Sequence, residues 1–160
     1  MSSESLPLNI LIVDDEPQNL RLLVQLLTFY DYQVRAVNSG RLALQSARLE
    51  PPALILLDVM MPEMDGYETC TQLKADPNTK DIPVIFLSAL DTLQDKVAAF
   101  QAGGVDYIIK PFQAEEVLAR IATHLQLREA QRQLQAQNAR LEQEIAERQR
   151  IAAHLRLLRE

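Results

Sequence analysis

The feature that most constrains this chain is the stretch Leu54-Ile55-Leu56-Leu57-Asp58, in which four consecutive apolar residues lead directly to one carboxylate. A short continuous apolar run is typical of a strand that is buried on both faces of a parallel sheet. Pro62 and then Asp65-Gly66 supply turn residues before the next helix. Asp58 is therefore predicted at the carboxyl end of a central strand, where open α/β sheets bind ligands. Taken alone, the stretch fits equally well an aspartate that caps the following helix.

Four further apolar runs alternate with helical patterns along the first 125 residues. The runs at 8–13, 34–37, 84–87 and 105–109 predict strands. Helices are expected at about 17–30, 39–49, 66–75 and 91–101, and from residue 113 or 114 onward. This alternation predicts an α/β fold of the (βα)5 type, a doubly wound parallel sheet with helices on both faces.

Polar side chains end four of the five predicted strands: Asp14 and Asp15, Asp58, Ser88 and Lys110. In a doubly wound sheet such strand ends can form one crevice. Three carboxylates repel one another unless a divalent cation neutralises them, and a site made only of oxygen ligands suits Mg²⁺. A cation, an ammonium group and a hydroxyl around one carboxylate form a receptor for a phosphoryl group. The carboxylate of Asp58 is then the natural nucleophile, and its product is an acyl phosphate.

Four motifs, in this order and at this spacing, make the chain from about residue 8 to residue 125 resemble the receiver domain of two-component response regulators. They are VDDEP at 13–17, LDVMMPEMDG at 57–66, LSA at 87–89 and DYIIKPF at 106–112. The resemblance implies a flavodoxin-like fold with the strand order 2-1-3-4-5. It also implies a phosphorelay function, with a histidine kinase or phosphotransfer protein as the partner.

The resemblance assigns the metal and phosphate roles residue by residue. It implies that Asp58 is the phosphoacceptor. Asp15 is expected to bind Mg²⁺ directly, and Asp14 directly or through water. The backbone carbonyl of Met60 is expected to complete the protein ligands together with Asp58.

The remaining family positions are also filled. Ser88 and Lys110 are expected to contact the phosphoryl oxygens, and Tyr107 matches the aromatic switch residue. The family's cis Lys-Pro bond maps to Lys110–Pro111. Two positions that flank the path of a hydrolytic water in the family are here Met60 and Leu90, whose side chains orient water poorly.

The last helical pattern continues past residue 125 without a proline or glycine. A leucine row with a seven-residue spacing is broken only by Arg148, and a second row of more polar residues alternates with it. The rows are Leu127, Leu134, Leu141, Arg148 and Leu155, and Gln131, Asn138, Ile145 and Ala152. Such a heptad seam predicts that residues 126–160 extend the last helix into a coiled coil that forms a homodimer. An isolated surface helix is the alternative, and the helix orientation in the pair is left open.

Charge and composition limit the other functions. Residues 1–125 carry nine basic and seventeen acidic side chains, whereas residues 126–160 carry seven and five. The acidic part disfavours nonspecific nucleic-acid binding. One cysteine, Cys70, forms neither an internal disulfide nor a metal site, and no apolar run approaches a membrane span. We therefore expect a cytoplasmic chain without a nucleic-acid or membrane partner, with a disordered segment at 1–7 and a receiver domain at 8–125.

Two other functional classes were compared with the receiver. A haloacid-dehalogenase-like phosphatase also uses an aspartate at a strand end, but it needs a second acid two residues later, where this chain has Met60. A coiled-coil adaptor with a silent receiver is the structural alternative. The chain itself is expected to be a phosphoacceptor and not an enzyme, and His124 and His154 are expected to be surface or packing residues. Because residues 140–156 resemble linkers that precede sensory, kinase or cyclase domains, we expect the N-terminal piece of a larger protein.

Overall fold

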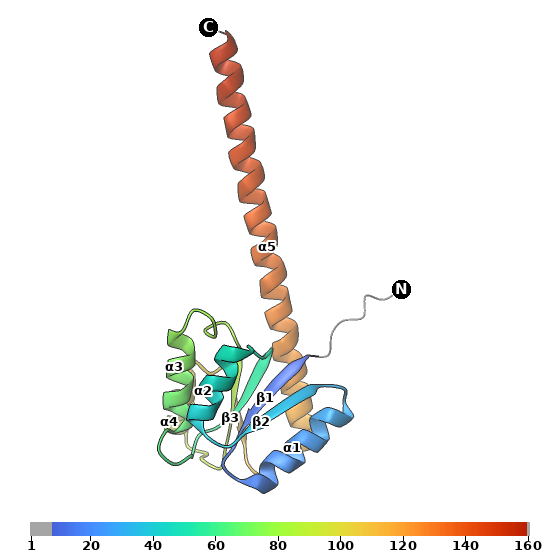
Figure 1. Cartoon of the computed structure of the whole chain (residues 1–160), viewed down its shortest axis with the longest axis vertical. Coiled ribbons are helices and arrows are strands. Elements are labelled where there is room, and N and C mark those ends of the chain that lie inside the picture. The colour runs from blue at the N-terminus through green and yellow to red at the C-terminus, as the bar shows by residue number, and fades with distance from the viewer. Residues whose placement is uncertain (1–7, 160) are drawn as a thin grey trace. The chain divides into compact units, whose positions relative to one another are not determined.

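The computed structural model describes residues 8–159, so the predicted disorder of residues 1–7 lies outside the described part of the chain. Five parallel strands form one sheet, with the order β2-β1-β3-β4-β5. Figure 1 labels β1, β2 and β3 of this sheet. They are β1 (Asn9–Val13), β2 (Gln33–Val37), β3 (Leu54–Asp58), β4 (Val84–Ser88) and β5 (Asp106–Ile109). The predicted flavodoxin-like α/β fold and its strand order are confirmed.

Five helices alternate with the strands: α1 (Pro17–Phe29), α2 (Gly40–Leu49), α3 (Gly66–Ala75), α4 (Leu93–Gln101) and α5 (Ala114–Arg159). Side chains of α1 and of the first turns of α5 pack on one face of the sheet, where Ile10 and Ile12 of β1 point. Side chains of α2, α3 and α4 pack on the other face, where Leu11 and Val13 point. Successive residues of one strand thus point in alternation into the two hydrophobic cores, one on each face of the sheet.

The helix starts follow local capping chemistry. The Ser39 hydroxyl accepts a hydrogen bond from the backbone N–H of Leu42 and begins α2, as predicted. Thr92 and Asp95 form a reciprocal capping box, so α4 begins at Leu93, two residues later than the sequence pattern indicated. Caps of this kind satisfy backbone N–H groups that have no partner within the helix.

The central strand β3 is buried along its whole length, and Asp58 at its end is only 5% exposed. Helix α3 is capped by Asp65, whose Oδ1 accepts from the Glu68 N–H at 2.9 Å. The interpretation of Asp58 as the cap of this helix is therefore wrong. Cys70 of α3 is fully buried in the hydrophobic core between the sheet and α2, α3 and α4.

The chain divides into two compact units, Met1–Leu125 and Gln126–Glu160. Helix α5 is 46 residues long and is continuous through the boundary between them, as the unbroken pattern predicted. Its buried residues, Val117 and Ile121, belong to the first unit. Among residues 8–159, none of the helices combines the length and the apolar character that crossing a membrane requires.

Candidate functional site

Three carboxylates meet at the edge of the sheet where the strands end. Asp14 follows β1 directly, Asp15 comes next, and Asp58 is the last residue of β3. One carboxylate oxygen from each lies within 4.8 Å of the others. Asp14 and Asp58 are buried, and Asp15 is exposed. The three carboxylates therefore lie together at this edge of the sheet, two of them buried and one exposed to solvent.

Lys110, immediately after β5, supplies the positive charge of the site. Its Nζ lies 2.9 Å from Asp14 Oδ2 and 3.4 Å from Asp58 Oδ1. Its backbone N–H donates to the carbonyl oxygen of Ser88 at 2.8 Å, and the bond from Lys110 to Pro111 is cis, as the resemblance implied. Burial alone would lower the pKa of the ammonium group, but the two carboxylates outweigh burial and raise it. Lys110 is therefore a fixed cation between Asp14 and Asp58.

A single lysine does not balance two buried carboxylates. Burial, and then repulsion from Asp14, raise the pKa of Asp58 from 3.8 to about 7, although Lys110 and the Met60 backbone oppose the rise. A cluster of oxygen ligands with excess negative charge is the donor set that Mg²⁺ prefers. The residues present therefore fit a magnesium ion held by Asp14, Asp15 and Asp58.

Ser88 and Tyr107 lie beside this cluster on neighbouring strands. Ser88 ends β4 and is fully buried, and its Oγ accepts from the Leu90 N–H at 3.1 Å. Tyr107 lies in β5, is 7% exposed, and donates from its hydroxyl to the Leu90 carbonyl oxygen at 2.6 Å. The ring of the predicted switch residue is thus already turned inward. The loop after β4 is held by both side chains.

A hollow of about 460 Å³ adjoins the carboxylates on the solvent side. Asp15, Met60 and Leu90 line it together with Val59, Met61, Pro62, Asp65 and Tyr67. Met60 is 60% exposed and Leu90 is partly buried. The two side chains that the resemblance places beside the water path therefore line one open space next to the site.

Gly66 has a role at the site that the sequence analysis missed. Its backbone N–H donates to the Val59 carbonyl oxygen at 2.8 Å, and its Cα faces the backbone of Asp58 and Val59. A Cβ at this position would lie 2.3 Å from the Asp58 carbonyl oxygen, closer than any real side chain allows. Asp65-Gly66 therefore does more than form a turn, because Gly66 lets the start of α3 approach the end of β3.

A second polar cluster, also missed, lies at the start of β5. Asp106 accepts hydrogen bonds from Arg120 Nη1 at 2.9 Å on each carboxylate oxygen, and its Oδ2 lies 2.9 Å from His124 Nε2. His124, expected to be a surface or packing residue, is partly buried, and its ring contacts a carboxylate. No local sequence signal marks this cluster, because its members are 14 and 18 residues apart.

Comparisons with known proteins agree with this geometry. The family model of the response regulator receiver domain matches residues 10–122. A signal receiver domain of a histidine kinase from Syntrophus aciditrophicus has a TM-score of 0.69 and 38% identity, covering 74% of this chain and 89% of that chain. The receiver domain of a sensor histidine kinase from Pseudomonas aeruginosa PAO1, with a magnesium ion in its active-site cleft, has a TM-score of 0.71 and 31% identity, covering 75% of this chain and 98% of that one.

Curated relatives are longer than this chain. A protein of Vibrio cholerae named as a probable cyclic di-GMP phosphodiesterase is 42% identical over 149 residues, which cover 92% of this chain and 34% of the relative. A match of that extent must continue beyond residue 125 into the second unit. The response regulator PleD of Caulobacter vibrioides is 43% identical over 112 residues, or 70% of this chain and 25% of PleD. The chain spans between a quarter and a half of the curated relatives it matches.

Proposed function

Because the chain belongs to the response regulator receiver domain family, we propose that it is a phosphoryl-accepting switch in which Asp58 takes phosphate from a histidine kinase or phosphotransfer protein. The observation that carries the proposal is the position of Asp58, buried at the end of the central strand within 3.4 Å of Lys110 and beside Asp14 and Asp15. We place this exchange in the cytoplasm, as predicted from the sequence.

The proposed reaction is a displacement at phosphorus. An Asp58 carboxylate oxygen bonds to the phosphorus of a phosphohistidine as the bond from phosphorus to the ring nitrogen breaks, and the released imidazole takes up a proton. Asp58 must be ionised to attack, so the groups that lower its pKa toward the usual range also favour the reaction. Lys110 and Ser88 are positioned to hold the phosphoryl oxygens, Lys110 by charge and Ser88 by its hydroxyl.

The metal requirement follows from the same charges. When bound by Asp14, Asp15, Asp58 and the Met60 carbonyl oxygen, Mg²⁺ would neutralise negative charge on the carboxylates and on the incoming phosphoryl oxygens. Asp14 shares its Oδ2 with Lys110, so the exposed Asp15 is the carboxylate most free to bind the ion directly. We therefore expect Asp15→Asn to weaken Mg²⁺ binding.

The direct test is phosphorylation by acetyl phosphate with Mg²⁺, followed by intact mass measurement. The wild-type chain should gain one phosphoryl group, and Asp58→Asn should gain none. Asp81→Asn, an exposed aspartate away from the site, is the matched control and should behave as wild type. A stoichiometric gain in Asp58→Asn would show that the acceptor is another residue, and no gain in wild type would favour the silent-receiver alternative. A phosphatase of the haloacid-dehalogenase type is disfavoured, because the position that needs its second acid is Met60, an exposed thioether.

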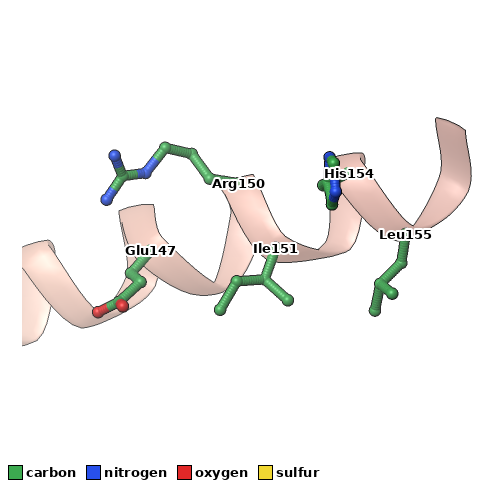
Figure 2. Close-up of a pocket in the computed structure, with 5 residues that line it drawn as sticks. All are labelled: Glu147, Arg150, Ile151, His154 and Leu155. Carbon is green, nitrogen blue, oxygen red and sulfur yellow. The ribbon is translucent and has the colours of Figure 1, made fainter. Parts of the chain in front are cut away.

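We also propose that the second unit pairs with a second copy as a coiled coil. Within it, the apolar side chains at the seam are all about half exposed: Leu127, Leu134, Leu141, Ile145 and Leu155. In the view of Figure 2, Glu147, Ile151 and Leu155 lie along the lower edge of the helix, and Arg150 and His154 lie along its upper edge. Ile151 therefore widens the apolar stripe beside Leu155. These residues line a shallow hollow of about 330 Å³, which a side chain of a partner helix can fill.

The output of the whole protein is a further proposal. The relative named as a probable cyclic di-GMP phosphodiesterase resembles this chain through most of the second unit as well as the receiver. Turnover of cyclic di-GMP is therefore the first activity to assay in the full-length gene product, with and without acetyl phosphate. The receiver itself would act only as acceptor and switch.

A further inference from the structure

Asp106 is the centre of a half-buried polar cluster that the phosphoryl-accepting function leaves unexplained. Its side chain is 17% exposed and His124 is 14% exposed. Its Oδ1 accepts from the Tyr107 backbone N–H at 2.8 Å and from Arg120, and its Oδ2 contacts Arg120 and His124. One carboxylate therefore fixes the first turns of α5 to the backbone of the switch residue.

A series of hydrogen bonds, joined through the residues Leu90 and Tyr107, connects this cluster to Ser88 at the phosphoryl site. The Ser88 hydroxyl accepts from the N–H of Leu90, and the Leu90 carbonyl accepts from the Tyr107 hydroxyl. The Tyr107 N–H then leads to Asp106, and Asp106 leads to His124. The Tyr107–Asp106 bond joins adjacent residues of β5, whereas the bond from Asp106 to His124 joins β5 to α5. A change in the Tyr107 backbone therefore acts directly on the carboxylate of Asp106.

We propose that Asp106 is a positioning residue for the Tyr107 switch and that through it the protonation of His124 is linked to the occupancy of the Asp58 site. The inference rests on the proposed function, since it assigns a second input to the same switch. A histidine contacting a carboxylate is suited to this role, because an imidazole ordinarily titrates near pH 6.5.

The sign of the link follows from the charges. Protonated His124 is attracted to the Asp106 carboxylate and strengthens their hydrogen bond. That bond holds Asp106 where it accepts from Tyr107, in the arrangement in which the Tyr107 ring lies inward. A phosphoryl group on Asp58 and a proton on His124 therefore favour the same arrangement, and each increases the affinity for the other.

The neighbouring charges modulate the link without reversing it. On β5 the charged group facing His124 is Asp106. On α5 it is Arg120, one turn earlier, which is bound to Asp106 and lies 4.0 Å from Glu116. The positive charge of Arg120 repels a protonated His124 ring, and the carboxylate of Asp106, in direct contact with the ring, attracts it.

The test is an NMR titration of the two histidine rings in the full chain, with Mg²⁺ alone and with Mg²⁺ and beryllium fluoride. Filling the Asp58 site should raise the titration midpoint of His124 by about 0.3 units or more, which corresponds to about a twofold mutual change in affinity. His154, which lies in the second unit, should titrate identically in both states and serves as the internal control. An unchanged or lowered His124 midpoint in protein that has bound beryllium fluoride would overturn the inference.

Variants separate the link from a purely structural role. Asp106→Asn should still bind beryllium fluoride but lose the shift at His124, and Asp106→Glu should recover part of it. If Asp106→Asn does not fold, His124→Gln decides, because it retains a hydrogen-bonding side chain that does not titrate. The ratio of wild-type to His124→Gln affinity for beryllium fluoride should then rise as the pH falls from 7.5 to 6 (about twofold), and a ratio independent of pH would refute the link. If wild type binds neither beryllium fluoride nor phosphate, the proposed function fails first and this inference with it.

Discussion

Gly66 lies so close to Asp58 that a Cβ added to the glycine would be 2.3 Å from the aspartate's carbonyl oxygen. The obstructing atom belongs to the backbone of β3 and cannot rotate away as a side-chain atom could. The start of α3 and the end of β3 therefore share a space that only glycine fits.

Replacing Gly66 by alanine should damage both stability and phosphorylation. We expect a loss of about 1–3 kcal/mol of unfolding free energy from overpacking and a slower gain of phosphate from acetyl phosphate, because β3 or α3 must shift. Gly40→Ala is the comparison, since the nearest atom to its Cβ would be the Thr69 hydroxyl oxygen, also at 2.3 Å, which belongs to a side chain and not to the backbone of β3. Urea unfolding and timed mass spectrometry measure the two effects. Equal behaviour of the two variants would show that the approach of α3 does not constrain the site.

Asp58→Asn should stabilise the protein at pH 8 when Mg²⁺ is removed with a chelator. The pKa of Asp58 is raised in the folded state to about 7 from 3.8, so ionising it opposes folding. The resulting loss of unfolding free energy is absent below pH 4. It grows as the pH rises and reaches its full size above about pH 7. The expected gain at pH 8 is on the order of 1 kcal/mol after allowance for solvent screening.

Thermal unfolding with and without the metal checks this expectation. Added Mg²⁺ should raise the Tm of wild type more than that of Asp58→Asn, because the variant lacks the charge that the ion compensates. At pH 4 the two proteins should have the same stability. A variant that is less stable than wild type at pH 8 without metal would show that the carboxylate of Asp58 is not under electrostatic strain.

The phosphate on Asp58 should be long-lived for a receiver. Met60 and Leu90 line the hollow beside the carboxylates, and neither side chain can orient a water molecule by hydrogen bonding. Met60→Asn combined with Leu90→Glu should speed hydrolysis by about tenfold, equivalent to ~1.4 kcal/mol of barrier. Phosphate release from the isolated chain with Mg²⁺ is the measurement. Leu93→Glu adds the same charge at an exposed position of α4 and should leave the rate unchanged. A double variant as slow as wild type would mean that water access is controlled elsewhere.

The chain should sediment as a dimer at tens of micromolar. The double variant Leu134→Glu with Leu141→Glu should be monomeric, since it places negative charge in the apolar seam. Leu157→Glu should not, because Leu157 is 71% exposed and lies outside both heptad rows. Asn138→Leu should raise dimer stability while loosening its register. A monomeric wild type under these conditions would exclude the coiled coil.

The sequence predicted those parts of the molecule that depend on strand ends. Asp14, Asp58, Ser88 and Lys110 each follow an apolar run, and parallel strands bring their carboxyl ends to one edge. The strand order came from the resemblance to receivers, because the hydrophobic pattern of a strand does not name its neighbours.

The parts that were missed depend on close approach between elements distant in the chain. The sequence indicates only that Gly66 is a turn residue. The structure adds that it lies against the backbone of Asp58, where a side chain would not fit. Asp106 and His124 are 18 residues apart, on a strand and a helix, and the motif that begins at Asp106 gives no sign of a histidine partner on the following helix. Such pairs become visible only when the register of the helix on the sheet is known.

The burial of Cys70 has a practical consequence for following the switch. Burial raises the pKa of this thiol to about 11, and its side chain is fully enclosed. Near neutral pH it is almost entirely a protonated, shielded thiol, so maleimides and spin-label reagents should not react with it in the folded protein. Because it is the chain's one native cysteine, a single cysteine introduced on the surface becomes a unique attachment point, and probes can be placed without altering the core.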